Sequence, residues 1–438
     1  MEPLSFFREL YTVLHICWIF FYETINYGIF RDWPSYIERT TTNLARVNIL
    51  YVKVFQAFAS NNNLIDEETN NKLLKFTDKA PWTSKDIDIG ELIEIGEECD
   101  LYFKDGYKTP INSGMISIVF KAQRRKDGVP VIVKMKRKNI DERLNESIEN
   151  LKTFLYLVSF LPFIKSYQIS DIVNKNISII RQQTDFNREV ENILKVKENC
   201  KNLKYVKIPD VDTEVTKKYP NCIIMEYIDG LKINEVDECD RIGFAKSVLK
   251  FGFVSTIIHS VAHGDLHCGN ILFIKDEHDK KYPHKIGVID FGIIFELDNH
   301  FRDALFELFT QMFKRPPRET MVHCIESVII ENAEVVRRID KKDYDAIIDI
   351  GTSLFKETIL NTEKMNQSQL YKFLNMLKDY LSKPELTSLG IRPSDKFVQI
   401  QLVLAMAHGA TLTLCKENIF KLMDEVLNEL FHTELLRD

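Results

Sequence analysis

Apolar residues follow helix-like patterns in the first part of this 438-residue chain. Residues Leu10–Tyr22 are almost entirely apolar or aromatic and are followed by Glu23. Residues 43–60 carry apolar side chains at three- and four-residue steps, the spacing of one helix face, and residues 66–78 also read as helical. Pro81-Trp82 then breaks the pattern. The sequence therefore predicts a helical extension ahead of a differently built core.

The next part of the chain has the character of strands. After an acidic segment at residues 85–100, residues 115–122 and 130–136 flank the turn Lys126-Asp127-Gly128. Two such runs around a turn that contains glycine predict a β-hairpin. Residues 222–230 are apolar at first and end in Asp-Gly, which predicts a buried strand that leads into a turn.

A second hairpin and a series of helices are predicted further on. Residues 240–262 have helical periodicity, and residues 271–274 and 285–289 read as two short strands joined by a charged turn. Beyond Gly292 we expect helices to the end of the chain. The predicted helices lie at residues 301–313, 320–336, 344–360, 369–381, 395–414 and 419–435.

The apolar stretch at the N-terminus has three interpretations. It is shorter than the about 20 residues that a membrane-spanning helix needs, and it lacks the charged start and the cleavage site of a secretory signal. It could pack on the main body as a helix, lie on a membrane surface, or extend through Ile25–Phe30 as a membrane span. The span would bury Glu23, which costs several kcal/mol unless the carboxylate is paired. A packed helix is the default expectation.

Composition and charge restrict the function classes. The apolar fraction of 45% and the charged fraction of 28% are ordinary for a folded soluble protein. The net charge of −6 does not favour a general affinity for nucleic acid. The eight cysteines stand singly, which argues against a disulfide framework and fits a reducing, intracellular compartment. Cys268 is expected to be a small filler rather than a nucleophile.

The strongest chemical signal is a pair of motifs. Residues 263–270 read His-Gly-Asp-Leu-His-Cys-Gly-Asn, and residues 288–292 read Val-Ile-Asp-Phe-Gly. The spacing from Asp265 to Asn270 is that of a kinase catalytic loop, where the aspartate orients or deprotonates a hydroxyl and the asparagine binds a metal ion. Asp290 supplies a second metal ligand. We predict Asp265 and Asn270, together with Lys134 of an earlier strand, as catalytic residues, and Asn270 and Asp290 as Mg²⁺ ligands.

An earlier strand carries a candidate phosphate-binding lysine. Val131-Ile132-Val133-Lys134 matches the kinase strand whose lysine neutralises the α- and β-phosphates of ATP. Such a lysine needs a carboxylate partner, and the helical stretch 185–192 offers two. Glu189 is the predicted partner, while Glu191 stays open because spacing alone does not separate them. The competing interpretation is that Lys134 is one of several cations at a solvated strand end.

The remaining nucleotide contacts are less regular. A loop that covers phosphates is usually rich in glycine, but residues 112–115 contain only one. Ser113 and Gly114 are nevertheless the predicted phosphate contacts. Backbone groups from Glu226 to Ile228 are predicted to meet the edge of the adenine.

Together these motifs resemble the UbiB/ADCK (aarF-domain) family of atypical kinases over roughly residues 45–310. Choline kinases and aminoglycoside phosphotransferases share the pattern of residues 263–270 but predict neither Lys53-Val54-Phe55-Gln56 nor the sequence of residues 225–230. By resemblance, Lys53 and Gln56 face the nucleotide pocket from a helix that crosses the site.

Two positions depart from the pattern of that family. Phe55 stands where the crossing helix has glycine, and Gln183 replaces the glutamate expected to hold Lys53. The metal-binding motifs are intact. This combination fits a diverged member of the family.

The resemblance implies an α+β, bilobal, protein-kinase-like fold with a small β-rich N-lobe and a helical C-lobe. We expect an N-terminal helical extension at residues 1–84, the N-lobe and hinge at residues 85–230, and the C-lobe with extra C-terminal helices at residues 231–438. No obvious activation-loop segment is present, which makes docking of a peptide substrate less expected.

The resemblance also implies binding of ATP or ADP with Mg²⁺. The implied activity is that of an ATPase or a phosphotransferase in lipid or isoprenoid (coenzyme Q-type) metabolism, often at a membrane, with a small-molecule or lipid acceptor. Two other functions stay open: a pseudokinase scaffold, and a small-molecule kinase that resembles aminoglycoside and choline kinases. His267, in place of the protein-kinase lysine, favours the small-molecule kinase.

Overall fold

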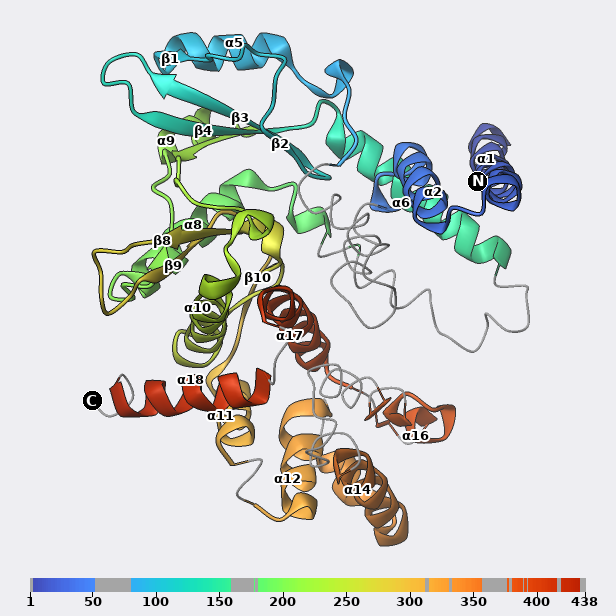
Figure 1. Cartoon of the computed structure of the whole chain (residues 1–438). Helices are drawn as coiled ribbons and strands as arrows, with labels where there is room; N and C mark the ends of the chain where they lie inside the picture. Colours follow the sequence, from blue (N-terminus) through green and yellow to red (C-terminus); the bar gives the residue numbers. More distant parts are fainter. Residues whose placement is uncertain are drawn as a thin grey trace. The chain divides into compact units, whose positions relative to one another are not determined.

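The computed structural model (Figure 1) describes most of the chain as two compact units. Unit 1 contains residues 1–194 and 209–228, and unit 2 contains residues 195–208 and 229–438. The described residues are 3–51, 80–158, 177, 180–311, 315–330, 333–356, 376–377, 380–388, 390–391, 393–415 and 419–433. The predicted helical stretch at 66–78 and most of that at 369–381 lie outside them, as do Lys53 and Gln56.

Unit 1 is built around an antiparallel sheet (Figure 1). Its main path runs β1-β3-β4-β6, and β2 pairs with β3. The predicted hairpin is confirmed, because β3 pairs with β4 along its length and places Val119 opposite Lys134. The strands of this sheet are β1 Leu101–Tyr102, β2 Asn112–Ser113, β3 Ser117–Arg124, β4 Pro130–Lys136 and β6 Cys222–Glu226.

The acidic segment before this sheet is a helix that the sequence analysis missed. Ile89–Glu98 forms α5, and the side chain of Asp88 accepts a hydrogen bond from the Glu91 backbone N–H at its start. Leu92 and Ile95 of α5 are fully buried in the core under the sheet. An N-cap aspartate ahead of this apolar spacing was the available signal. The other helices of unit 1 are η2 Ser84–Asp86, α6 Ile140–Val158, α8 Phe186–Cys200, which continues into unit 2, and α9 Thr213–Lys218.

The N-terminal extension contains α1 (Pro3–Phe30) and α2 (Trp33–Val47), which pack against each other. The predicted continuous helix at residues 43–60 is wrong, because α2 starts earlier and ends before Asn48, whose backbone is extended. The Asn48 side chain donates to the Ser147 carbonyl at 2.9 Å and accepts from the Leu50 backbone N–H. These bonds hold the chain out of the helix at this point.

One face of α1 is buried and carries an ion pair. Ile16 and Ile19 lie in a core shared with α2 and α6. Glu23 is only 2% exposed, and its carboxylate accepts hydrogen bonds from Arg39 Nε at 2.8 Å and Asn43 Nδ2 at 3.3 Å. These partners reduce the penalty of burying the charge. The predicted packing of this segment on the main body is therefore present.

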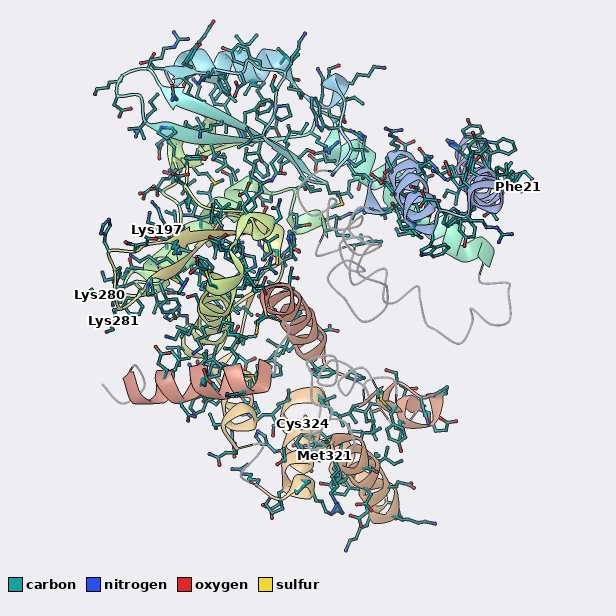
Figure 2. All side chains as sticks on the ribbon, in the orientation of Figure 1. Phe21, Lys197, Lys280, Lys281, Met321 and Cys324 are labelled. Atoms are coloured by element: carbon teal, nitrogen blue, oxygen red, sulfur yellow. The ribbon has the colours of Figure 1, made fainter. Side chains whose placement is uncertain are left out.

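The opposite face of α1 is unusually apolar. Phe21 lies on the side of α1 that is turned away from α2 (Figure 2). Leu10–Phe30 is long and apolar enough to cross a membrane by length and composition alone, and this is the longer stretch through Ile25–Phe30 that the sequence left open. The exposed large apolar residues of α1 are Tyr11, Leu14, Trp18, Phe20, Phe21, Tyr22, Ile25, Ile29 and Phe30.

Unit 2 contains two small sheets. The predicted second hairpin is confirmed as β8 (Ile271–Lys275) and β9 (His284–Val288), and β5 (Val206–Lys207) adds a parallel strand to it. The other sheet pairs β7 (Val261–His263) with β10 (Ile294–Glu296). Both of its strands were missed, because the sequence analysis extended the helix before His263 to residue 262 and expected only helices after Gly292.

Two of the predicted helices in unit 2 are shorter than expected. The helix before the catalytic loop ends at Ile258, because Ser260 adopts a left-handed conformation and Val261 begins β7. The helix expected at residues 320–336 is interrupted at Ile330, whose extended backbone bridges to Pro393. In each case a pairing with a distant segment overrides the local helical pattern.

The helices expected at residues 301–313, 344–360, 395–414 and 419–435 are present with somewhat different ends, whereas α16 was not predicted. The run that contains α17 is a buried helix, as expected, since Phe397, Ile400 and Val403 are buried. Met321 and Cys324 lie where α12 meets α14 (Figure 2). The helices of unit 2 are η4 Ile233–Glu235, η5 Glu238–Asp240, α10 Arg241–Phe253, the π-helix η6 Val254–Ile258, η7 Cys268–Asn270, α11 Asn299–Gln311, α12 Pro317–His323, the π-helix η8 Cys324–Ile329, α13 Ala333–Arg338, α14 Lys341–Phe355, α16 Pro384–Ser388, α17 Asp395–Leu414 and α18 Ile419–Thr433.

Candidate active site

A buried ion pair in unit 1 joins the predicted phosphate-binding lysine to its predicted partner. Lys134 Nζ lies 2.5 Å from Glu189 Oε1, and the two side chains are 8% and 1% exposed. The Phe186 ring closes the site on one side, with its centroid 5.6 Å from Lys134 Nζ. Because both charges are withdrawn from water, their geometry is fixed by the pairing rather than by the solvent.

The helix α8 explains why Glu189 rather than Glu191 is the partner. Phe186, Val190 and Ile193 are buried and lie on one face of α8 at three- and four-residue steps. Glu189 falls next to this face, whereas Glu191 is exposed. The alternative that spacing alone left open is thereby resolved in favour of the pairing of Glu189 with Lys134. The role of the pair in binding a nucleotide stays a prediction.

In unit 2, His263 connects the two predicted motifs. The Asp265 backbone N–H donates to His263 Nδ1 at 3.2 Å, so Nε2 carries the proton and donates to the Asp290 carbonyl at 2.6 Å. Burial lowers the pKa of His263 and keeps the ring neutral, which this arrangement requires. The catalytic loop is therefore tied by one side chain to the segment that carries Asp290.

The two predicted functional residues of the loop are also tied to each other. Asn270 Nδ2 donates to the Asp265 backbone carbonyl at 2.8 Å, and the Asn270 carbonyl accepts from the Ile289 backbone N–H at 3.1 Å. His267 Nδ1 accepts from the Gly269 backbone N–H, and His267 Nε2 lies 3.7 Å from Asp265 Oδ1. The Asp265 side chain is thus buried beside an imidazole N–H.

Asn270 and Asp290 fit a Mg²⁺ ion by the chemistry of their oxygens. Because the Asn270 amide nitrogen is held by Asp265, its side-chain oxygen is the end left for a ligand. Asp290 Oδ1 accepts from the Gly292 backbone N–H, and the side chain is half-buried. Within the described part of the chain no group of three His, Cys, Asp or Glu side chains could hold a metal. Mg²⁺ usually takes one or two protein oxygens and completes its shell with phosphates and water.

Close packing holds the catalytic loop in place. A Cβ atom on Gly264 would lie 2.4 Å from Ile293 Cγ2 and 2.6 Å from Phe295 Cε2, so only glycine allows this approach. On another side Cys268 Sγ contacts the Ala410 carbonyl of α17. Burial raises the pKa of the Cys268 thiol to about 12, which keeps it protonated and supports its expected role as a filler.

The predicted phosphate loop is built differently from the expectation. Ser113 is 3% exposed and its hydroxyl donates to the Ala80 carbonyl at 2.6 Å. The Gly114 backbone N–H donates to the Ser117 carbonyl. Both donors therefore take part in hydrogen bonds within unit 1, and their contact with phosphate stays a prediction.

Arg137 is a structural residue at this loop that the sequence analysis did not single out. Its guanidinium is buried and donates to the carbonyls of Gly114 and Pro81, and it lies 3.3 Å from the carboxylate of Asp86. In the sequence it is one cation in a basic run, so nothing local distinguishes it from its exposed neighbour Lys138.

The predicted hinge follows β6. The backbone N–H of Glu226 donates to the Asp210 carbonyl at 2.7 Å, and Ile228 is buried. Lys121 Nζ lies 3.6 Å from the centroid of the Tyr227 ring. Because the Glu226 N–H is already used, an adenine contact by this residue would rely on its carbonyl group.

A model of the ABC1 atypical kinase-like domain matches residues 75–323, which is more than half of the chain. The chain belongs to this family. The resemblance to UbiB/ADCK proteins is thereby confirmed, and so is the protein-kinase-like α+β fold with additional N-terminal helices.

Relatives in this family come from distant organisms. The chain is 28% identical to "Probable serine/threonine-protein kinase abkB" of Dictyostelium discoideum over 58% of its own length and 38% of the relative. It is 26% identical to "Probable protein kinase UbiB" of Shewanella woodyi over 68% of its length and 54% of the relative. It is 24% identical to the chloroplastic "Protein ACTIVITY OF BC1 COMPLEX KINASE 8" of Arabidopsis thaliana over 66% and 38%. The chain therefore spans about two fifths to one half of these relatives.

A solved structure, that of a Mycobacterium tuberculosis protein in complex with erythromycin, aligns with 85% of this chain and 91% of its own. The TM-score is 0.49 and the sequence identity is 16%.

Proposed function

We propose that this protein binds ATP or ADP with Mg²⁺ and transfers the terminal phosphoryl group of ATP to water or to a small-molecule hydroxyl. The observation that carries the proposal is the hydrogen-bonded connection of Asp265, Asn270 and Asp290 in unit 2. This connection holds the proposed acceptor-orienting aspartate and the two proposed metal ligands in one network, which suits a reaction that depends on positioning.

Each unit contributes its own residues to the proposed reaction. In unit 1, Lys134 neutralises the α- and β-phosphates, and Glu189 holds the lysine in position. In unit 2, the oxygens of Asn270 and Asp290 hold the metal, which when bound neutralises charge on the phosphates. Asp265 orients the acceptor hydroxyl and takes up its proton.

Positioning is the main contribution of such residues to phosphoryl transfer. Asp265 is held by its backbone carbonyl, which receives the Asn270 amide, and by its backbone N–H, which donates to His263. The buried neutral imidazole of His263 links the backbone of Asp265 to that of Asp290 without adding a charge.

The experiment that tests the proposal is a thermal-shift titration of the full chain with ATP and ADP, each with and without Mg²⁺. A ligand that binds only the folded protein stabilises it by about 2.7 kcal/mol at one hundred times its dissociation constant. We expect a concentration-dependent rise in melting temperature that requires Mg²⁺, together with release of ADP from ATP. No shift at millimolar nucleotide would contradict the proposal.

One observation favours a second candidate function, the pseudokinase scaffold. The Ser113 hydroxyl and the Gly114 N–H are used within unit 1, which leaves fewer groups for the phosphates than an active kinase loop offers. A Mg²⁺-dependent thermal shift without ADP release, after a screen of hydroxyl-bearing metabolites, would support the scaffold. ADP release with one metabolite would instead support a small-molecule kinase like the aminoglycoside and choline kinases.

The acceptor is proposed from the family relation. The resemblance to UbiB/ADCK proteins implies a role in lipid or coenzyme Q-type isoprenoid metabolism, so we propose a lipid or isoprenoid-related acceptor. We also propose a reducing intracellular compartment, which the eight free cysteines support.

We further propose that α1 binds a membrane surface. Trp18, Phe21 and Tyr22 expose more than half of their side-chain surface on one helix face, and the other face is anchored by Glu23. Aromatic side chains of this kind favour the interface between lipid and water. The anchoring keeps α1 attached to unit 1 while its outer face is available.

Replacing Trp18 and Phe21 by Ser is expected to weaken binding of the full chain to phosphatidylcholine vesicles at least about tenfold, because burial of each side chain contributes about 1.5–3 kcal/mol. Cosedimentation with vesicles measures the effect. The control variant Tyr102→Ser/Val129→Ser removes two exposed apolar side chains from the sheet of unit 1. Equal loss in both variants, or no vesicle binding by the wild type, would overturn the role of α1.

A further inference from the structure

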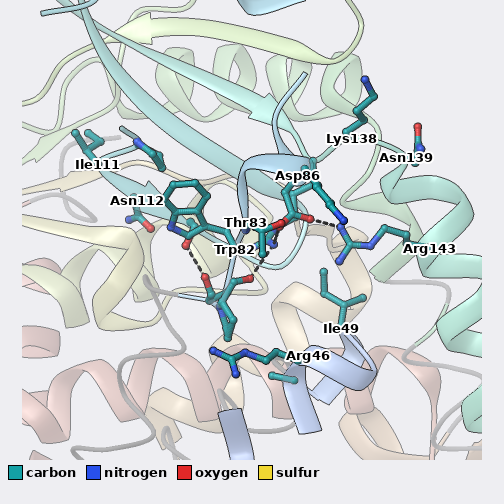
Figure 3. Close-up of a pocket in the computed structure, with 17 residues that line it drawn as sticks. Arg46, Ile49, Trp82, Thr83, Asp86, Ile111, Asn112, Lys138, Asn139 and Arg143 are labelled. Carbon is teal, nitrogen blue, oxygen red and sulfur yellow. Dashed lines mark hydrogen bonds and ion pairs between the residues drawn. The ribbon is translucent and has the colours of Figure 1, made fainter. Parts of the chain in front are cut away.

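Unit 1 contains a cavity whose lining does not include Lys134 or Glu189. Its volume is about 950 Å³, within the range of small-molecule sites. The walls come from the end of α2, from residues 80–86, from residues 110–113 beside β2, and from residues 137–143 after β4 (Figure 3). Ser113, a predicted phosphate contact of the nucleotide, also lines this cavity, but its hydroxyl donates to the Ala80 carbonyl.

The lining of the cavity is strongly basic. It contains Arg46, Lys85, Arg137, Lys138 and Arg143, and Asp86 is the one carboxylate among the described lining residues. Lys138 is neutralised from outside the cavity by Asp88, at 3.2 Å.

Two of these cations have no ion partner among the described residues. Arg46 and Lys85 are exposed, and no ion pair of either is found among the residues that the structure describes. A cavity with this balance attracts anions.

Asp86 organises the arginines rather than cancelling the charge. Its Oδ2 accepts from the Thr83 backbone N–H at 2.7 Å and lies 3.3 Å from buried Arg137, while its Oδ1 accepts from Arg143 Nη1. Arg143 remains 41% exposed at its side chain. One edge of its guanidinium is thus fixed by a carboxylate that is itself fixed, and the other edge is left for a ligand. Guanidinium groups held in this way suit phosphate oxygens.

The cavity also has an apolar side. Figure 3 shows Trp82 and Ile111 on one side of the cavity and Arg143 on the other, with Ile49 below. Trp82 is 38% exposed and Ile111 is 44% exposed, so both side chains offer uncovered apolar surface to a ligand. A simple inorganic anion would use only the basic half of this lining.

We propose that this cavity binds an organic phosphate. Its phosphate group contacts Arg46, Lys85 and Arg143, and its apolar part packs against Trp82 and Ile111. The ligand is a phosphomonoester of a soluble molecule or the headgroup of a lipid, since both present the same chemistry. The site is separate from the proposed nucleotide site and does not depend on it.

Trp82 provides a direct measurement. The chain contains three tryptophans, and the other two, Trp18 and Trp33, can be replaced by Phe so that emission comes from Trp82 alone. In this background we expect phenyl phosphate to change the emission of Trp82 with saturation. The same titration with saturating Mg-ATP present should give the same dissociation constant. Absence of a saturable change, or displacement by Mg-ATP, would overturn a separate site.

Charge-matched variants test the contacts. Arg46→Gln/Lys85→Gln is expected to raise the dissociation constant of phenyl phosphate about tenfold or more, because two charge-assisted contacts are lost. Arg124→Gln/Lys126→Gln removes the same charges from the exposed end of β3 and the turn after it, and should leave the dissociation constant unchanged. Both pairs are exposed, so the melting temperatures should stay close to that of the background protein. Equal weakening in both variants would contradict the assignment.

A competition experiment with vesicles distinguishes a lipid headgroup from a soluble phosphomonoester as the ligand. Phosphatidylcholine vesicles with and without phosphatidic acid are titrated against a constant concentration of phenyl phosphate. Displacement of phenyl phosphate by phosphatidic acid vesicles alone assigns the site to a lipid headgroup. Failure of both kinds of vesicle to displace it assigns the site to a soluble phosphomonoester. Displacement by phosphatidylcholine vesicles as well would overturn recognition of a phosphomonoester.

Discussion

The variant Asp290→Asn is expected to lose the Mg²⁺-dependent part of nucleotide binding completely. Asn keeps the shape of the side chain and its oxygen can still accept from the Gly292 N–H, so the local structure survives. What disappears is the negative charge, and a neutral amide beside Asn270 leaves a divalent ion with two weak ligands. The thermal shift with Mg-ATP, about 2.7 kcal/mol of stabilisation in the wild type at one hundred times the dissociation constant, should vanish.

A matched control separates this effect from a general loss of charge. Asp237→Asn makes the same change at an exposed position of unit 2 where the side chain makes no capping hydrogen bond. It should respond to Mg-ATP like the wild type. Without nucleotide, all three proteins should unfold at nearly the same temperature. A Mg²⁺-dependent shift that persists in Asp290→Asn would remove Asp290 from the site.

The parts of this site that could be predicted are those encoded by short spacings. The separation of Asp265 and Asn270 specifies one tight loop, and the hairpin of β8 and β9 follows from two apolar runs around a polar turn. Glu189 could also have been chosen over Glu191, because it lies three residues after Phe186 and four before Ile193 on the buried face of α8.

The parts that could not be predicted depend on contacts between distant segments. Asn48 ends α2 because its side chain reaches Ser147, and no local pattern announces that partner. The strand β10 has three residues and exists because it pairs with β7. Ser113 looks available in the sequence but is buried against Ala80. In each case a helix or loop that is locally acceptable gives way to a hydrogen bond with another part of the chain.

The ion pair of Lys134 and Glu189 can be tested for structure and for function at once. Lys134→Met and Glu189→Leu each leave one buried charge without its main partner, and removing one member of a buried pair costs about 3–5 kcal/mol of unfolding free energy. The double variant Lys134→Met/Glu189→Leu removes both charges and replaces them with apolar groups. We expect its loss of stability to be much smaller than the sum of the two single losses.

Binding of Mg-ATP should not recover in the double variant, although its stability does. A pair that serves only the fold would allow the double variant to regain Mg-ATP binding as it regains stability. If Lys134 contacts the phosphates, Mg-ATP binding stays absent in the double variant although the protein is folded, because the cation proposed to neutralise the α- and β-phosphates is gone. The wild type, the two single variants and the double variant are compared in two measurements. Denaturation midpoints without nucleotide report stability, and thermal shifts with Mg-ATP report binding. Recovery of Mg-ATP binding in the double variant would restrict this pair to a structural role and would require another cation for the phosphates.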